Sequence, residues 1–226
     1  MAVNYAVSEL RVWSYHAVNL GLHLAAALVM FGLVRRTLLL RKEFREMASG
    51  LAATISGLWA AHPLQTESVT YIIQRGEVGM GLCVLLTLYA LTRSVGSSKQ
   101  RKWEMAAVSV CLVGYGFKPI MVVTPLLAWV YDRCFLSGGF ATAWKVRGRL
   151  HLGLWLTPLV LPVLLAGSAV EWRTSAGFEF EGVSTLEYAS TQPEIILHYL
   201  RLVIWPSPLV LDYGWPVERS WMVIGI

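Results

Sequence analysis

Charged residues are scarce in this chain of 226 residues, because Asp, Glu, Lys and Arg make up 15% of it and a soluble domain carries about a quarter. Hydrophobic residues make up 56%, and the mean hydropathy is +0.55. This balance excludes an ordinary soluble domain and a nucleic-acid-binding protein, and it indicates an integral membrane protein. The formal net charge of +5 is therefore interpreted first as a signal of membrane topology.

Cysteines and the sequence motifs of soluble enzymes are also scarce. Cys83, Cys111 and Cys134 form an odd set without a C-x-x-C pair, so neither a disulfide framework nor a thiolate metal site is expected. The sequence contains no P-loop, no G-x-G-x-x-G fingerprint and no Ser/His/Asp order of a nucleophilic triad. We therefore expect neither a bound metal nor a cofactor.

Long apolar runs, by contrast, are frequent. Six of them are expected to span the membrane: residues 12–34, 49–62, 78–92, 103–117, 120–131 and 150–170. A helix of about 20 apolar residues crosses a hydrocarbon core of roughly 30 Å, so the first run suffices alone and the second needs its flanks or neighbours. Pro119 after Lys118 predicts a hairpin between the fourth and fifth runs. The predicted fold is all-α, a polytopic membrane helix bundle with additional interfacial helices.

The distribution of Lys and Arg predicts the orientation of this bundle. Three alternate connections, residues 35–48, 93–102 and 132–149, hold 13 of the 19 basic residues. Cytoplasmic loops are enriched in Lys and Arg, so these connections are expected in the cytoplasm and the remaining polar segments on the extracytoplasmic side.

Both ends of the chain are expected to lie inside a longer protein. Residues 1–11 are assigned to the outer side, yet they contain no signal peptide and no preceding span. Residues 221–226 begin a further apolar run that stops after about a turn and a half. The whole chain, residues 1–226, is accordingly predicted to be one partial membrane domain.

The first outward segment, residues 62–77, carries unusual ionisable groups. Glu67, Arg75 and Glu77 lie at near-helical spacing, and Thr66 is expected to cap this helix. One interpretation is an amphipathic helix at the membrane surface; the other is a functional group of charges close to membrane depth. Lys118 at the hairpin tip allows the same two interpretations. It is either a lone lysine that extends to the headgroups or a functional charge.

The second outward segment covers residues 171–220. A break is expected at Gln192 and Pro193, followed by an interfacial helix over residues 194–205 that carries Arg201 on its polar side.

Polar residues also occur inside the first predicted span. His16, Asn19 and His23 recur at three and four residues and therefore share one face of the helix. Two histidines without a carboxylate partner favour hydrogen bonds between helices over a metal site.

Four strings of the sequence together resemble one known family: WSYHAVNLGLHL at 13–24, HPLQTESVTYIIQR at 62–75, GFKP at 116–119 with YDR at 131–133, and YLRLVIWPSPLVLDYGWP at 199–216. In collinear order they resemble bacterial relatives of the transmembrane and tetratricopeptide-repeat (TMTC) proteins. The resemblance implies a membrane domain of the GT-C glycosyltransferase class, similar to protein O-mannosyltransferases. Such enzymes transfer sugar from a polyprenyl-phosphate carrier to an acceptor on the outer face, and the membrane would be the bacterial inner membrane.

The resemblance also suggests which residues form the site. A lipid phosphate requires cations at headgroup depth, and Arg75, Lys118 and Arg201 are the candidates for binding it. The candidate supporting residues are His62, Glu67, Glu77, Asp212 and Tyr213.

Two departures from the family pattern weaken the expectation of activity. No residue here matches the acidic residues of the family's first outward loop, so no catalytic residue is assigned, and Pro119 stands where relatives have Glu after the lysine. The chain alone is therefore expected to be inactive. The alternative function is a non-catalytic membrane scaffold or accessory subunit that binds partner membrane subunits, and a transporter is less favoured because the charges gather on one side.

Overall fold

The computed structural model describes residues 2–162, 185–210 and 213–214. The chain divides into two units, residues 1–164 and residues 165–226. All regular structure in the described residues is helical, which confirms the predicted all-α class.

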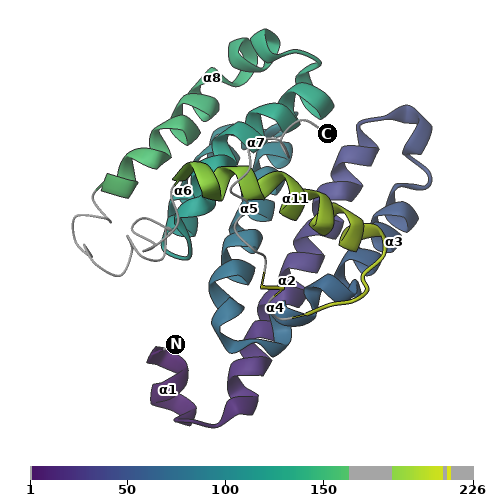
Figure 1. Ribbon diagram of the computed structural model, residues 1–226. Helices are drawn as coiled ribbons and strands as arrows, with labels where there is room; N and C mark the ends of the chain where they lie inside the picture. Colours follow the sequence, from purple (N-terminus) through teal and green to yellow (C-terminus); the bar gives the residue numbers. More distant parts are fainter. Residues whose placement is uncertain (1, 163–184, 211–212, 215–226) are drawn as a thin grey trace. The chain divides into compact units, whose positions relative to one another are not determined.

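Unit 1 is a bundle of helices (Figure 1). Its α-helices are α1 (Ala2–Ser8), α2 (Val12–Leu39), α3 (Ala48–Ala60), α4 (Thr66–Thr70), α5 (Arg75–Ser94), α6 (Gln100–Tyr115), α7 (Thr124–Tyr131) and α8 (Phe140–Leu156). Short 3₁₀ segments lie between them at Lys42–Phe44, Pro63–Gln65, Ile72–Gln74 and Pro119–Val123, a π-helix follows α7 at Asp132–Ser137, and a 3₁₀ turn follows α8 at Thr157–Leu159.

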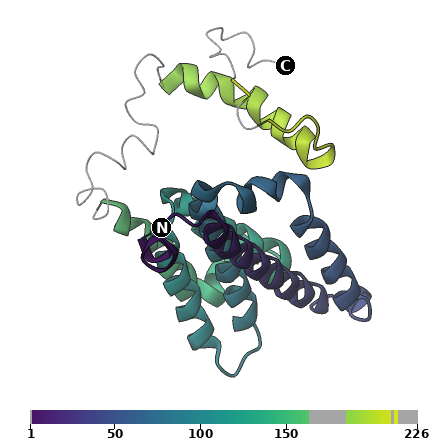
Figure 2. The ribbon, with the colours of Figure 1, turned by 90° about the horizontal axis from the view of Figure 1, so that it is seen from below.

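Helix α5 joins the two halves of this bundle. It packs against α2, which also packs against α3, and against α6 and α7, which in turn pack against α8. Figure 2 shows the same helices from below, with α2 and α3 in one half and α6 to α8 in the other. The buried core is formed by apolar side chains of several helices, including Leu33, Leu91, Tyr115, Met121 and Leu154.

The long helices of unit 1 run in alternate directions, and this gives the bundle two distinct ends. At one end Arg35 of α2 donates to Ser49 of α3, and the hydroxyls of Thr37 and Tyr131 form a hydrogen bond. The basic end is defined by the connections at residues 35–48, 93–102 and 132–149, and the motif end by residues 60–79, residues 115–121 and the start of α2. The three basic connections therefore gather at one end of the bundle, and the assignment of this end to the cytoplasm stays a prediction.

The outer surface of unit 1 is strongly apolar, as a lipid-facing surface should be. Leu28, Leu58, Met105 and Val113 are each more than 60% exposed on helices of the bundle. Within the described residues, three helices are long and apolar enough to cross a membrane: Val12–Leu39, Ile72–Ser94 and Pro119–Ser137. These helices indicate an integral membrane protein.

Each of the six predicted spans coincides at least in part with a helix, but three of these helices are short. Helices α3, α6 and α8 contain 13, 16 and 17 residues and do not meet the length required of a span by themselves. The six-span arrangement therefore stays a prediction. Helix α8 also begins ten residues before the predicted run at 150–170, inside the expected basic loop.

The outward segment at 62–77 is not one amphipathic helix. It forms a 3₁₀ turn, the five-residue helix α4, a second 3₁₀ turn and then the start of α5. The expected cap by Thr66 is also wrong, because its hydroxyl donates to the carbonyl of Pro63 and His62 caps the first turn instead. Proline at position 63 favours this early break because it removes a backbone donor and restricts the residue before it.

In unit 2 the described residues form α11 (Thr185–Ile204) and a following loop. The predicted break at Gln192 and Pro193 is wrong, since Pro193 lies inside the continuous helix α11. Proline deletes only its own hydrogen-bond donor, and the rest of the helix remains regular around it. Residues 171–184, 211–212 and 215–220 of the predicted outward segment and the final run at 221–226 lie outside the described residues.

Candidate functional site at the motif end

The polar stripe of α2 forms the base of the motif end. His16 Nδ1 lies 3.2 Å from the carbonyl oxygen of Val69, and His23 Nε2 lies 3.0 Å from that of Ala60. Between them, Asn19 Nδ2 donates to the carbonyl oxygen of Tyr71 over 3.3 Å. These contacts confirm that the two histidines are hydrogen-bonding residues between segments.

The stripe has a clear physical cause in the broken segment that it faces. Helix α3 ends at Ala60, and residues 61–74 form short turns and the five-residue helix α4, so the regular helical hydrogen bonds of the backbone are interrupted. Backbone carbonyls in such a segment must be satisfied by protein if they lie at membrane depth. The side chains of α2 contact three of these carbonyls, and the buried Asn19 adds a second donor to the carbonyl of Tyr71, which also accepts from the amide of Gln74.

Arg75 ties three parts of the chain together at this base. Its Nε donates to Oδ1 of Asn19 over 3.0 Å, its Nη1 to Oδ1 of Asn4 over 2.8 Å, and its Nη2 to the carbonyl oxygen of Tyr15 over 3.2 Å. The guanidinium also lies 5.7 Å from the centre of the Tyr15 ring. Three of its donors are therefore directed at α1 and α2, which makes Arg75 a residue that holds the motif end together.

Lys118 occupies the tip of the predicted hairpin and pairs with a carboxylate. Its ammonium group forms an ion pair with Glu77 on the first turn of α5, and both side chains are 40% exposed. Phe117 packs so closely on α5 that a Cβ at Gly79 would overlap its ring. The structure thus brings Arg75, Glu77 and Lys118 to the same end of the bundle.

The remaining candidates of unit 1 contribute less to this group. His62 accepts a hydrogen bond from the amide of Leu64 over 3.2 Å, which is a local capping contact. Glu67 is exposed on α4.

Of the candidates of unit 2, Tyr213 packs against α11 and Arg201 lies on that helix. His198 of α11 lies with its ring centre 4.6 Å from that of Tyr213, and Tyr213 donates to the carbonyl oxygen of Pro208 over 2.8 Å. Arg201 lies one turn after His198 on the same helix. Asp212 lies outside the described residues.

The sequence reasoning missed the most buried ionic group among the described residues, which lies at the basic end. Asp132 accepts from Nε and Nη2 of Arg147 over 2.7 and 2.6 Å, from the ring of His151 over 2.8 Å and from the hydroxyl of Ser137 over 2.7 Å. Asp132 and His151 are fully buried, and Arg147 is 7% exposed. The available signal was that Asp132 is the only acidic residue among residues 132–149.

The sequence of the chain is similar to those of known membrane enzymes. The chain is 38% identical over 183 residues to protein O-mannosyl-transferase TMTC2 of Mus musculus, a match that covers 75% of the chain and 20% of the relative. It is 32% identical over 111 residues to protein O-mannosyl-transferase TMTC3 of Homo sapiens, which covers 49% of the chain and 11% of that relative. Its homologues are TMTC-type protein O-mannosyl-transferases.

The similarity covers only a small part of each relative. The alignments span about a tenth to a fifth of the curated TMTC relatives. No protein-family model matches the chain, and no solved structure matches it. The similarity to TMTC2 and TMTC3 supports the TMTC-like, membrane-protein resemblance that the sequence motifs suggest.

Proposed function

We propose that this chain is part of a GT-C-type membrane glycosyltransferase, which transfers a sugar from a polyprenyl-phosphate donor to a protein or another acceptor. The carrying observation is the similarity to protein O-mannosyl-transferases over three quarters of the chain. On this proposal the motif end faces the extracytoplasmic side, six helices cross the membrane, and that membrane is the bacterial inner membrane.

Lys118 is the proposed phosphate ligand of unit 1. Its ion pair with Glu77 is partly exposed, and exposed pairs contribute only about 0–1 kcal/mol. A lipid phosphate can therefore compete with Glu77 for the ammonium group, because charge-assisted contacts to phosphate are stronger. Glu77 would then hold Lys118 in place when the site is empty.

Arg75 receives a different role from the one expected from sequence. With three donors bound to Asn4, Asn19 and Tyr15, it is proposed as a positioning residue beneath the phosphate site. For unit 2, taken by itself, Arg201 of α11 remains a proposed phosphate ligand.

A specific observation also favours the alternative, a non-catalytic scaffold or accessory subunit. The same contacts that occupy Arg75 give the motif end a purely structural explanation, and no catalytic acid is assigned. In that case the exposed apolar helices would bind partner membrane subunits.

Native mass spectrometry of the gently extracted protein tests both functions. The glycosyltransferase proposal expects a retained polyprenyl-phosphate mass that is reduced in Lys118→Ala and in Arg201→Ala and is unchanged in Lys102→Ala, a charge removal at the basic end. Retention that is equal in all four proteins would eliminate the phosphate site. Co-purifying chains without such a lipid would favour the scaffold.

Transfer of radiolabelled sugar from a polyprenyl-phosphate donor, measured with the full-length gene product, tests the reaction itself. No transfer by a folded full-length protein that retains the lipid would contradict enzymatic activity.

A further inference from the structure

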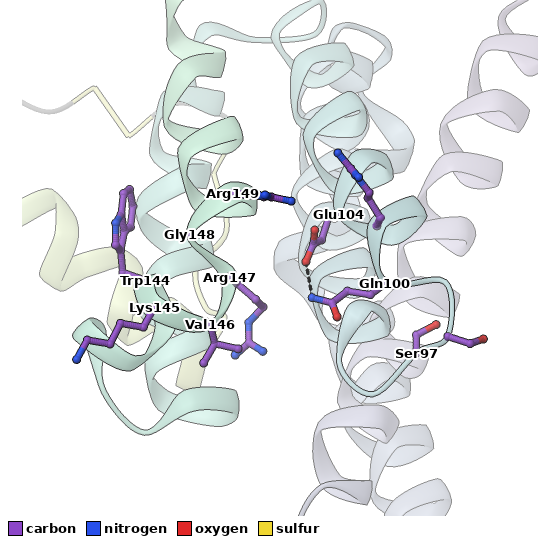
Figure 3. A pocket seen from close by; sticks show the side chains of 11 residues that line it. Ser97, Gln100, Glu104, Trp144, Lys145, Val146, Arg147, Gly148 and Arg149 are labelled. Atoms are coloured by element: carbon purple, nitrogen blue, oxygen red, sulfur yellow. Dashed lines mark hydrogen bonds between the residues drawn. The ribbon is translucent and has the colours of Figure 1, made fainter.

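A cavity of about 740 Å³ opens between α6 and α8 at the basic end of unit 1 (Figure 3). One wall is the connection before α6 with the first turns of that helix, and the other wall is the middle of α8. Its lining includes Arg101 and Glu104 on the first side and Trp144, Lys145, Gly148 and Arg149 on the second. The proposed glycosyl-donor site lies at the opposite end of the bundle.

The cavity results from the way in which the two helices diverge. Helices α6 and α8 run in the same direction and are in contact farther along, where Gly153 permits close approach of Val108. Beyond that point Cys111 Sγ lies 3.5 Å from Oγ1 of Thr157, so the helices stay together toward the motif end. Toward the basic end the spacing widens, and Gly148 places no side chain in the space.

A local distortion of α8 shapes the cavity wall. Arg147 has φ −127° and ψ 30°, values outside the helical range, and its guanidinium is directed at the buried carboxylate of Asp132. The bidentate contact fixes the distorted turn, because an arginine and a carboxylate bind in one preferred geometry. Arg147 is therefore used internally, whereas its neighbours Lys145 and Arg149 stay exposed on the wall.

The cavity carries an excess of positive charge that the described residues of unit 1 do not neutralise. Within residues 2–162, the ion pairs do not include Arg101, Lys145 or Arg149. Figure 3 shows Arg149 extending from α8 toward α6. The single carboxylate of the lining, Glu104, accepts from Nε2 of Gln100 over 2.7 Å. The amino-terminal end of α6 adds the positive end of a helix dipole to these cations.

The surroundings of the cavity are those of a lipid interface. Met105 on α6 and Leu152 on α8 are 64% and 52% exposed just beyond the charged lining, so an apolar surface continues from it along both helices. Trp144 is 44% exposed at its rim, and tryptophan is enriched at the boundary between headgroups and hydrocarbon. A free anion would bind only to the cations of the cavity. A lipid would also bind to the exposed apolar surface of α6 and α8.

We propose that this cavity binds the phosphate-bearing headgroup of an anionic membrane phospholipid, with its acyl chains against α6 and α8. Arg101, Lys145 and Arg149 contact the headgroup, and the Asp132–Arg147 pair holds the wall in shape. Basic pockets between membrane helices bind anionic headgroups through the same combination of charge and apolar surface.

The test measures retention of phosphatidylglycerol against phosphatidylcholine by the full chain after extraction from mixed nanodiscs, using native mass spectrometry. The double variant Lys145→Gln/Arg149→Gln is expected to lose affinity on the order of twentyfold, since each cation near the surface contributes about a fivefold change. The matched control, Lys42→Gln/Lys102→Gln, removes two exposed charges of the same end outside the cavity and should retain the lipid.

A third variant separates cavity shape from charge. In Gly148→Leu the charges remain, and a Cβ there meets only ordinary contacts with Trp144 at 3.9 Å. The leucine should occupy the part of the cavity between the cations and lower retention of phosphatidylglycerol without unfolding the protein, as checked by thermal unfolding. Equal loss in the cavity double variant and in its control would show unspecific charge attraction and overturn the proposal.

Glycerol 1-phosphate added as a soluble competitor distinguishes the two sources of the phosphate. Weak competition at millimolar concentration with strong lipid retention supports a membrane lipid. Binding of glycerol 1-phosphate without preferential retention of phosphatidylglycerol would overturn the lipid assignment.

Discussion

The motif end and the basic end of unit 1 use their cations in opposite ways. At the motif end both cations have partners in the chain. Arg75 donates to three acceptors, and Lys118 pairs with Glu77. At the basic end one arginine, Arg147, is buried on Asp132, while Arg101, Lys145 and Arg149 line an open cavity. Positive charge therefore remains available to a ligand where internal acceptors are few. The number of basic residues matters less.

The largest effect is expected from breaking the buried pair at the basic end. Asp132→Ala leaves Arg147 buried and without its carboxylate, which should lower the free energy of unfolding by about 3–5 kcal/mol. Thermal unfolding in detergent measures this change. The control Glu43→Ala removes an exposed acid of the same end and should change stability by less than about 0.5 kcal/mol. Similar unfolding temperatures for the two variants would contradict a structural role of the pair.

A smaller loss is expected when the tie at the motif end is removed. Arg75→Met leaves the oxygen atoms of Asn19 and Tyr15 without their donor, at a cost of about 2–3 kcal/mol. Arg75→Lys keeps the charge but cannot reach three acceptors with a planar fork, so it should restore only part of the stability. If Arg75→Lys had the stability of the unaltered protein, the positive charge alone would matter at this position. The hydrogen bonds to three acceptors would then not distinguish the motif end from the basic end.

Two glycines of α5 test the packing of the hairpin without touching a charge. Gly79→Ala should destabilise the protein by about 1–2 kcal/mol, because the new methyl group overlaps Phe117 and the core must shift. Gly81→Ala has open space around its Cβ and should be neutral or slightly stabilising on the same helix. Unfolding temperatures of the two variants in parallel check the difference, and equal values would contradict the close hairpin contact.

The smallest effect on stability is expected from Lys118→Gln. Its pair with Glu77 is 40% exposed on both sides, so its loss should cost at most about 1 kcal/mol. If polyprenyl-phosphate retention falls clearly in Lys118→Gln while its stability hardly changes, the loss reports on binding. Lys118 would then differ from Arg75, whose role is structural. A stability loss comparable with that of Arg75→Met would instead place Lys118 among the structural residues.

Much of the helix arrangement could be predicted from hydrophobicity and charge. The long runs at 12–34 and 78–92 correspond to α2 and α5, and the alternating basic connections meet at one end because successive helices reverse direction. The three cations among residues 140–149 predict a loop, whereas the structure has the first part of α8 there. These residues form helix because Asp132 neutralises Arg147 and the other two cations face the cavity.

The contacts of the candidate site were only partly accessible from sequence. The stripe of His16, Asn19 and His23 predicted hydrogen bonds between segments, since polar groups in a span must face protein. Its partners are backbone carbonyls, which carry no sequence signal. Arg75 could be placed at the motif end, but its acceptors lie 56 to 71 residues away in the chain and follow only from the tertiary packing.

The polar stripe of α2 also sets an order for the assembly of the bundle. The carbonyls of Ala60, Val69 and Tyr71 receive hydrogen bonds from a helix that leaves the ribosome before them. Without α2 in the membrane, the carbonyls of Ala60 and Val69 would lack these side-chain contacts, while the carbonyl of Tyr71 would keep the amide of Gln74 as its donor. The first long helix therefore acts as a template for the later one, and substitutions in its stripe should slow insertion of residues 61–94 before they affect any chemistry.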